Sequence, residues 1–207
     1  MINISLLALF VPTFFMVSIT PGMCMTLSLT LGMSLGLRRT FYMMWGELVG
    51  VALVSIAAVA GVAAIMLNHP QAFILLKYCG GGYLTYVGVQ TLRSRGKMPL
   101  SDQLQTDQHV SPEKLALQGF ITAIANPKGW AFMISLLPPF IDQNYPVTPQ
   151  IVVLLTLILL IEFFCLVIYA SGGKRLRTFL SKKGGTRLLN RISGVLMIAV
   201  GFWLALG

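Results

Sequence analysis

Two acidic residues, Glu47 and Glu162, lie inside apolar stretches that are long enough to cross a lipid bilayer. An ionisable side chain at that depth costs about 2.5–3.5 kcal/mol on insertion scales, and the chain has only six acidic residues in all. Such a residue is by default a site for a proton, an ion or a substrate. The two glutamates therefore predict a small membrane transporter. The alternatives are a protonated, hydrogen-bonded carboxyl for Glu162, and a salt bridge or an interfacial position for Glu47.

Lys128 is the basic counterpart of these residues, at mid-depth in a further apolar stretch. Its ammonium group is expected to bind a carboxylate or to pair with one of the two glutamates. The alternative is that its long stem carries the charge to solvent in a cavity. Cys24, between Met23 and Met25, raises a different chemistry, because soft sulfur ligands select Cu(I) and similar metals. Methionine is also a routine apolar filler, so a soft-metal site is the minor alternative.

The composition places these groups in a membrane protein. Of the 207 residues, 56% are hydrophobic and 10% are charged, against about 25% charged residues in soluble domains. This length predicts a single transmembrane domain over residues 1–207. The net charge of +9 does not predict a nucleic-acid partner, because thirteen of the fifteen Lys and Arg residues fall in or beside three connecting segments. We expect the lipid bilayer, a small substrate and protons as partners, and the sequence leaves a homodimer open.

Six membrane-spanning helices are predicted, each with about the 20 residues that a bilayer requires. They cover residues 3–37, 41–67, 71–92, 115–141, 148–171 and 188–206. Basic residues mark the segments 38–40, 93–114 and 172–187 as cytoplasmic, which puts both termini outside a cell inner membrane. The N-terminal stretch has no basic start and is too long for the core of a cleavable signal, so we expect it to form the first span.

Proline interrupts the first and the fourth of these spans near their middles. The first contains Thr20-Pro21-Gly22, and as one straight helix it would be ~55 Å long against a membrane core of ~30 Å. The fourth contains Asn126 and Pro127 directly before Lys128. Because proline removes a backbone donor, we expect broken helices at Pro21-Gly22 and Asn126-Pro127. Backbone groups freed at such breaks coordinate substrates and ions in transporters, whereas a plain packing kink is the alternative.

The two halves of the chain carry the same features in the same order. Each has a proline-broken span, then a span with one glutamate, then a span with glycines. The glycines correspond in pairs, Gly81 with Gly194 and Gly88 with Gly201. The halves are residues 1–93 and 115–207, and a polar cytoplasmic linker at 94–114 joins them. Three spans per half require opposite orientations, so the fold class expected is an all-α membrane protein of two inverted three-helix repeats.

The motifs at these breaks are similar to those of the LysE/RhtB family of amino-acid exporters. That family has a Pro-Gly-Pro motif in its first span and an Asn-Pro-Lys motif in its fourth. This chain has Pro21-Gly22 followed by Met23, and Asn126-Pro127-Lys128. The acid of the fifth span, Glu162, also matches, whereas Glu47 in the second span stands four residues before the family's usual place. The resemblance covers nearly the whole chain and implies a six-span exporter.

These observations predict an exporter of amino acids or close derivatives that exchanges them for protons by alternating access. The residues expected to bind the substrate or the coupling ion are Glu47, Glu162, Lys128, Asn126, Pro127, Thr20, Pro21, Gly22 and Cys24. Export of a soft metal cation or another small solute through the same fold is the alternative. The sequence contains no nucleotide-binding or catalytic motif, so we expect neither a cofactor nor an enzyme activity.

Overall fold

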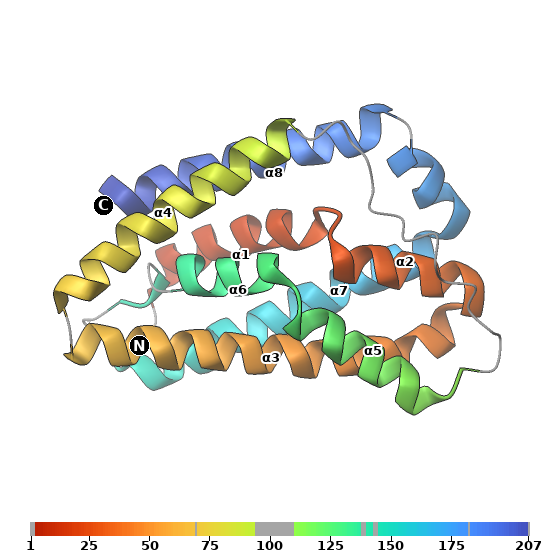
Figure 1. The fold of residues 1–207 in the computed structure, drawn as a ribbon, viewed down its shortest axis with the longest axis horizontal. Coiled ribbons are helices and arrows are strands. Elements are labelled where there is room, and N and C mark those ends of the chain that lie inside the picture. Colours follow the sequence, from red (N-terminus) through yellow and green to blue (C-terminus); the bar gives the residue numbers. More distant parts are fainter. Residues whose placement is uncertain are drawn as a thin grey trace.

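The computed structural model describes residues 3–68, 70–93, 110–137, 140–142, 145–181 and 183–206, which form a bundle of helices (Figure 1). Eight helices account for most of these residues, and no β-strand occurs among them. The helices are α1 (Ile4–Ile19), α2 (Met23–Leu35), α3 (Leu37–Asn68), α4 (Pro70–Arg93), α5 (Pro112–Ile124), α6 (Pro127–Leu136), α7 (Val147–Ser181) and α8 (Lys183–Leu206). The predicted all-α class is therefore confirmed.

Both predicted helix breaks are present, and local chemistry explains each of them. The axes of α1 and α2 are bent by 58° at the first break, where Pro21 cannot donate a backbone hydrogen bond. At the second break, the Asn126 side chain accepts a hydrogen bond from the Lys128 N–H and so caps α6. Pro127 takes the start of α6, where its missing N–H costs nothing and its fixed φ suits a helix.

Two helices have the length and hydropathy to cross a membrane, at Leu37–Gly61 within α3 and Val147–Gly173 within α7. The bent pair of α1 and α2 makes a third span if it is counted as one. No other helix in the described part of the chain meets this criterion, so six spans remain a prediction. Figure 1 shows both chain ends toward the left-hand end of the bundle, and the turn between α2 and α3 at the right-hand end. The side of the membrane that each end faces also remains a prediction.

Two of the predicted loops between helices differ from the structure. The loop expected at 38–40 is wrong, since these residues are in α3 and the chain turns at Gly36, where φ is 78°. Only glycine adopts that backbone conformation without strain. The loop expected at 172–187 is also wrong for most of its length, since α7 runs on to Ser181 and α8 begins at Lys183. Within α7, Gly173 departs from helical geometry with φ of 47°.

The linker expected between the halves ends earlier than predicted. α5 begins at Pro112, because the Ser111 side chain accepts a hydrogen bond from the Lys114 N–H and caps the helix. Linker residues 94–109 lie outside the described residues. The division of the chain into residues 1–93 and 115–207 stays a prediction.

Small residues bring three helix pairs close together: α3 with α5, α2 with α7, and α4 with α8 (Figure 1). A Cβ on Gly46 would overlap the backbone of α5, and a Cβ on Gly119 would overlap the backbone of α3. A Cβ on Gly32 would likewise overlap the backbone of α7. Close backbone approach through small residues is a common mode of helix association in membranes.

Glycines of α4 and α8 make two close contacts. Each contact becomes the other when every glycine is replaced by its predicted counterpart in the other half of the chain. A Cβ on Gly88 would lie 2.8 Å from the Gly194 carbonyl oxygen, and one on Gly201 would lie 2.6 Å from the Gly81 carbonyl oxygen. Gly81 is paired with Gly194, and Gly88 with Gly201. Exchanging the members of each pair turns the first contact into the second. This relation within one helix pair supports the inverted repeat, which remains a prediction for the whole fold.

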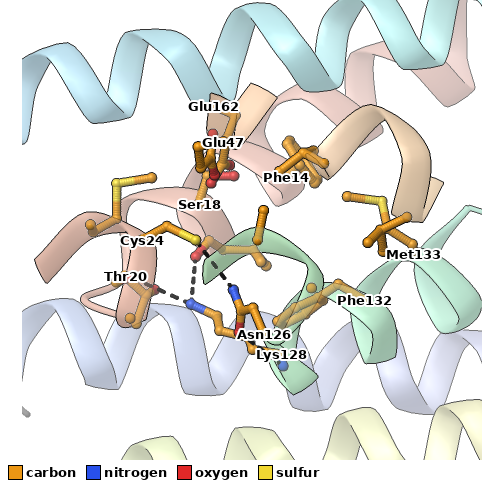
Figure 2. Close-up of a pocket in the computed structure, with 17 residues that line it drawn as sticks. Phe14, Ser18, Thr20, Cys24, Glu47, Asn126, Lys128, Phe132, Met133 and Glu162 are labelled. Atoms are coloured by element: carbon orange, nitrogen blue, oxygen red, sulfur yellow. Dashed lines mark hydrogen bonds between the residues drawn. The ribbon is translucent and has the colours of Figure 1, made fainter. Parts of the chain in front are cut away.

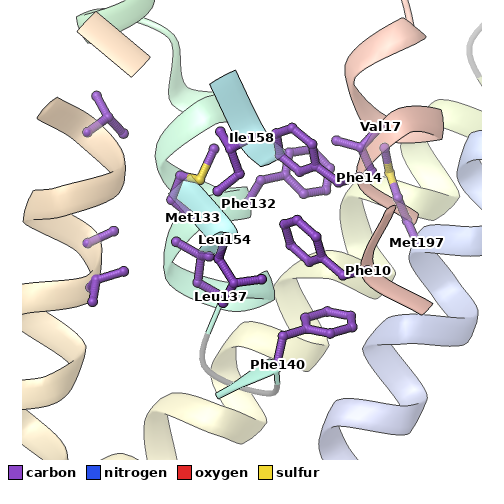
Figure 3. Close-up of a cluster of buried hydrophobic side chains, with 13 residues drawn as sticks. Phe10, Phe14, Val17, Phe132, Met133, Leu137, Phe140, Leu154, Ile158 and Met197 are labelled. Carbon is purple, nitrogen blue, oxygen red and sulfur yellow. The ribbon is translucent and has the colours of Figure 1, made fainter. Parts of the chain in front are cut away.

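Buried apolar side chains form two clusters, one toward each end of the bundle. The first apolar cluster joins α1, the second half of α3, α6, the first half of α7 and Met197 of α8 (Figure 3). In it the Phe10 ring stacks on Phe14 and meets Phe140 edge to face, with centroids 5.5 Å and 5.0 Å apart. The second apolar cluster joins α2, the first half of α3, Leu115 of α5 and the last part of α7. The region around both helix breaks lies between them.

Candidate functional site

A cavity of about 60 Å³ lies where the two broken spans meet (Figure 2). Its walls come from α1, α2, α3, α5, α6 and α7, so both halves of the chain contribute. Along α7, Glu162 separates Ile158 of the first apolar cluster from Cys165 of the second. Since one water molecule needs roughly 10–15 Å³ of such space, the cavity holds about four to six waters.

Seven of the nine residues predicted to bind the substrate or the coupling ion line this cavity. They are Thr20, Gly22, Cys24, Glu47, Asn126, Lys128 and Glu162. The other two, Pro21 and Pro127, lie in the helix breaks themselves. The fold therefore brings together residues that are as far apart in the chain as Thr20 and Glu162.

The two carboxyl groups lie next to each other on one side of the cavity (Figure 2). Glu47 is completely buried, and neither of its carboxyl oxygens has a hydrogen-bond partner among the described residues. Ser18 lies beside Glu162. Among the described residues no salt bridge to Glu47 is found, and the side chain is enclosed by the protein. A buried carboxyl group without a donor is costly, so this side of the cavity calls for a cationic ligand or a proton.

Lys128 binds the end of α1, and among the described residues it forms no ion pair with a glutamate. Its Nζ donates to the carbonyl oxygens of Val17 at 3.0 Å and Thr20 at 3.3 Å. These carbonyls are at the C-terminal end of α1, where the helix dipole is negative and the last carbonyls lack partners within the helix. An ammonium group has three donors, so one remains for the cavity.

Two further side chains hold the same end of α1. The Tyr169 hydroxyl of α7 donates to the Ile19 carbonyl oxygen at 2.8 Å. The Ser193 hydroxyl of α8 donates to the Met16 carbonyl oxygen at 2.9 Å. With Lys128 of α6, three helices of the second half therefore supply donors to one helix end in the first half. The carbonyl side of the first break is already occupied by the protein.

The N–H side of the first break is open. No side chain caps α2 at Gly22, and the backbone N–H groups of Met23–Met25 have no partner among the described residues. These groups carry the positive end of the helix dipole and suit an anion. At the second break, by contrast, Asn126 Oδ1 accepts from the Lys128 N–H at 3.2 Å, and Pro127 has no N–H. The first break therefore offers the cavity more free donors than the second.

Cys24 belongs to this site through its thiol, which accepts a hydrogen bond from the Asn126 side-chain amide at 3.6 Å. Cys24 and Cys165 are both buried and free. In the described part of the chain, no three His, Cys, Asp or Glu side chains are grouped so that they could hold a metal ion. The soft-metal alternative gains no support from this geometry.

The apolar wall of the cavity is not identified by sequence analysis. Phe14, Phe132 and Met133 lie on the right in Figure 2, away from Cys24 and Thr20 on the left. The signal available was helical spacing, since Phe132 lies four residues after Lys128 and therefore on the same face of its helix. Apolar residues at this spacing occur on every buried helix face, so the spacing does not single out these positions.

Comparison with known proteins identifies relatives of this chain and the family to which it belongs. A Vibrio cholerae protein named "Uncharacterized membrane protein" is 26% identical over 188 residues, which cover 91% of this chain and 90% of the relative. A Salmonella typhimurium protein named "Homoserine/homoserine lactone efflux protein" is 25% identical over 190 residues, which cover 92% of this chain and 91% of the relative. No solved structure matches the chain. Residues 15–207 match the family described as LysE type translocator, and the chain therefore belongs to that family.

Proposed function

We propose that this protein exports amino acids or close derivatives from the cytoplasm across the cell inner membrane, in exchange for protons. Membership of the LysE type translocator family makes it a membrane translocator rather than an enzyme. The Salmonella relative named for homoserine and homoserine lactone efflux supports an amino-acid substrate. The observation that carries the proposal is the fully buried Glu47 carboxyl group, next to the Glu162 carboxyl group and without a cationic partner among the described residues, in a cavity at both helix breaks.

The two glutamates are assigned to the amino group of the substrate. A primary ammonium group has three donors, and the Glu47 oxygens have no donor of their own among the described residues. A cation bound between the two carboxyl groups removes the cost of leaving them unpaired in a region of low dielectric constant. In the absence of substrate the same carboxyl groups take up a proton. Proton and substrate thus compete for one place, which is what exchange requires.

The start of α2 is assigned to the carboxylate of the substrate. Cys24 and Met25 at its start line the same cavity as Lys128, and the backbone N–H groups of Met23–Met25 have no partner among the described residues. Because Lys128, Tyr169 and Ser193 already occupy the carbonyls of α1, the first break suits an anion rather than a cation. Paired recognition of an ammonium and a carboxylate group is the pattern that a zwitterion needs.

Transport requires the cavity to open to one side of the membrane at a time. An apolar cluster lies between the cavity and each end of the bundle. In the proposed cycle the helices separate at one cluster while they stay packed at the other. The related glycine contacts of α4 and α8 support a repeat relation between the halves, on which such alternating movement is based in other transporters.

Efflux from proteoliposomes preloaded with labelled amino acids tests the proposal. We expect a pH gradient to drive efflux of one group of amino acids, and Glu162→Gln, which keeps the size but loses the charge, to abolish the driven efflux. Glu113→Gln is the matched control, because Glu113 is exposed at the start of α5. Transport by Glu162→Gln against a substrate gradient would show that Glu162 is not the coupling group. If the folded protein moves no amino acid, the proposed substrate class is wrong.

A further inference from the structure

Resting on the proposed function, we infer that the cavity selects α-amino acids with a small, uncharged, apolar side chain and rejects dibasic and acidic ones. An α-amino acid presents three groups from one carbon atom, and the cavity has three kinds of wall. The glutamate pair takes the ammonium group, and the start of α2 with Lys128 takes the carboxylate. The third wall is left for the side chain of the substrate, and its chemistry sets the substrate class.

The third wall is apolar throughout. Phe14, Phe132 and Met133 form it, on the side of the cavity away from Cys24 (Figure 2). All three are buried and belong to the first apolar cluster, which continues behind them (Figure 3). An apolar substrate side chain placed there extends this cluster and loses water contact, which is favourable.

A dibasic substrate would place its second cation against this wall without a partner. Among the described residues that line the cavity, the charged ones are Glu47, Lys128 and Glu162. The two carboxyl groups lie together, so they serve one ammonium group and leave none for the far end of a lysine or arginine side chain. The Phe132 ring is a poor cation–π partner for a second cation, because Lys128 Nζ lies over it at 5.8 Å from the centroid and would repel that cation.

An acidic substrate is excluded for the opposite reason. Its second carboxylate would lie either beside Glu47 and Glu162, where like charges repel, or against the aromatic wall, where the donor nearby is Lys128, already assigned to the α-carboxylate. The size of the cavity adds a limit on length. A volume of about 60 Å³ leaves little room for a long side chain beside the ammonium and carboxylate groups.

The first experiment compares substrates on the unaltered full-length protein. Proteoliposomes are loaded in parallel with labelled alanine, valine, lysine, arginine or glutamate at one internal concentration. We expect kcat/KM for alanine or valine to exceed that for the charged amino acids by at least about tenfold, the range set by pocket contacts. Equal efflux of lysine or glutamate overturns this inference and leaves the proposed function standing. Failure of every amino acid to move overturns both.

The second experiment tests the wall itself. Phe132→Leu enlarges the space for the substrate side chain, and we expect it to shift the preference toward larger apolar amino acids such as leucine. Phe10→Leu is the matched control, because it makes the same change in the same cluster at a residue that does not line the cavity. Should Phe132→Leu fail to fold, Met133→Ala enlarges the same wall. An unchanged preference, or the same shift in Phe10→Leu, would overturn the assignment of this wall.

Discussion

Replacing Tyr169 by phenylalanine removes one hydroxyl group and leaves the buried ring in place. Tyr169 is 1% exposed, and its hydroxyl donates to the Ile19 carbonyl oxygen at 2.8 Å. Ile19 is the last residue of α1, so its carbonyl has no partner within the helix. Among the described residues Tyr169 is its only donor. Tyr169→Phe therefore leaves a carbonyl at the first break without a hydrogen bond.

The expected cost follows from that lost partner. A carbonyl left unsatisfied inside the protein costs about 1–3 kcal/mol of unfolding free energy. For a chain of 207 residues, 1 kcal/mol corresponds to roughly 2–4 °C in Tm, so the variant should unfold roughly 2–12 °C lower. The assay is thermal unfolding in detergent at one fixed lipid content. Tyr42→Phe is the matched control, because Tyr42 is 47% exposed and its hydroxyl donates to no helix end among the described residues.

Ser193→Ala gives a second test of the same helix end. The Ser193 hydroxyl donates to the Met16 carbonyl oxygen, one turn earlier in α1. Both donors act on one helix end, so the costs of Tyr169→Phe and Ser193→Ala should not add, and a coupling energy of about 0.5–3 kcal/mol is expected. Transport should weaken in both variants, because the same helix end positions the start of α2. If Tyr169→Phe changes Tm no more than Tyr42→Phe does, the Tyr169 hydroxyl does not stabilise the end of α1.

The remaining predictions concern packing and capping. Gly119→Ala puts a Cβ against the backbone of α3, which should cost about 1–3 kcal/mol in thermal unfolding, whereas Gly82→Ala, where a Cβ meets nothing within 4 Å, should cost little. The pKa of the Glu113 carboxyl lies below its ordinary value because its own backbone N–H and the Ser111 hydroxyl bind the charged form. The stabilisation by Glu113 is therefore lost as the pH falls through the lowered pKa, and Ser111→Ala should raise that pKa in a carboxyl NMR titration; an unchanged pKa would contradict this assignment.

Much of the candidate site could be predicted because it depends on local chemistry. Pro21 and Pro127, next to glycine and asparagine, favour a break in a helix, and a glutamate such as Glu162 is costly in any apolar stretch. The turns could not be placed in the same way. Basic residues indicate which side of the membrane a segment faces but not whether it is helical. Gly36 turns the chain, but it is one of 20 glycines, so its residue type does not single it out.

The partners of the polar groups could not be predicted for a different reason. The Lys128 ammonium binds carbonyls 111 and 108 residues away in the chain, those of Val17 and Thr20. Every residue has a backbone carbonyl, so residue type does not mark these two as acceptors. Ser193 and Tyr169 are ordinary residues of apolar helices until the fold places them against α1.

The places of the two helix breaks, the charged residues within apolar stretches and the matching order of these features in the two halves can be read from the chain. These properties follow from residue type and spacing alone. The folded chain is needed to show that both breaks and both glutamates line one cavity, and that among the described residues Lys128 binds carbonyls and no side chain caps α2. The physical reason is that packing assigns each donor to its acceptor, and here the partners lie on helices that are distant in the chain.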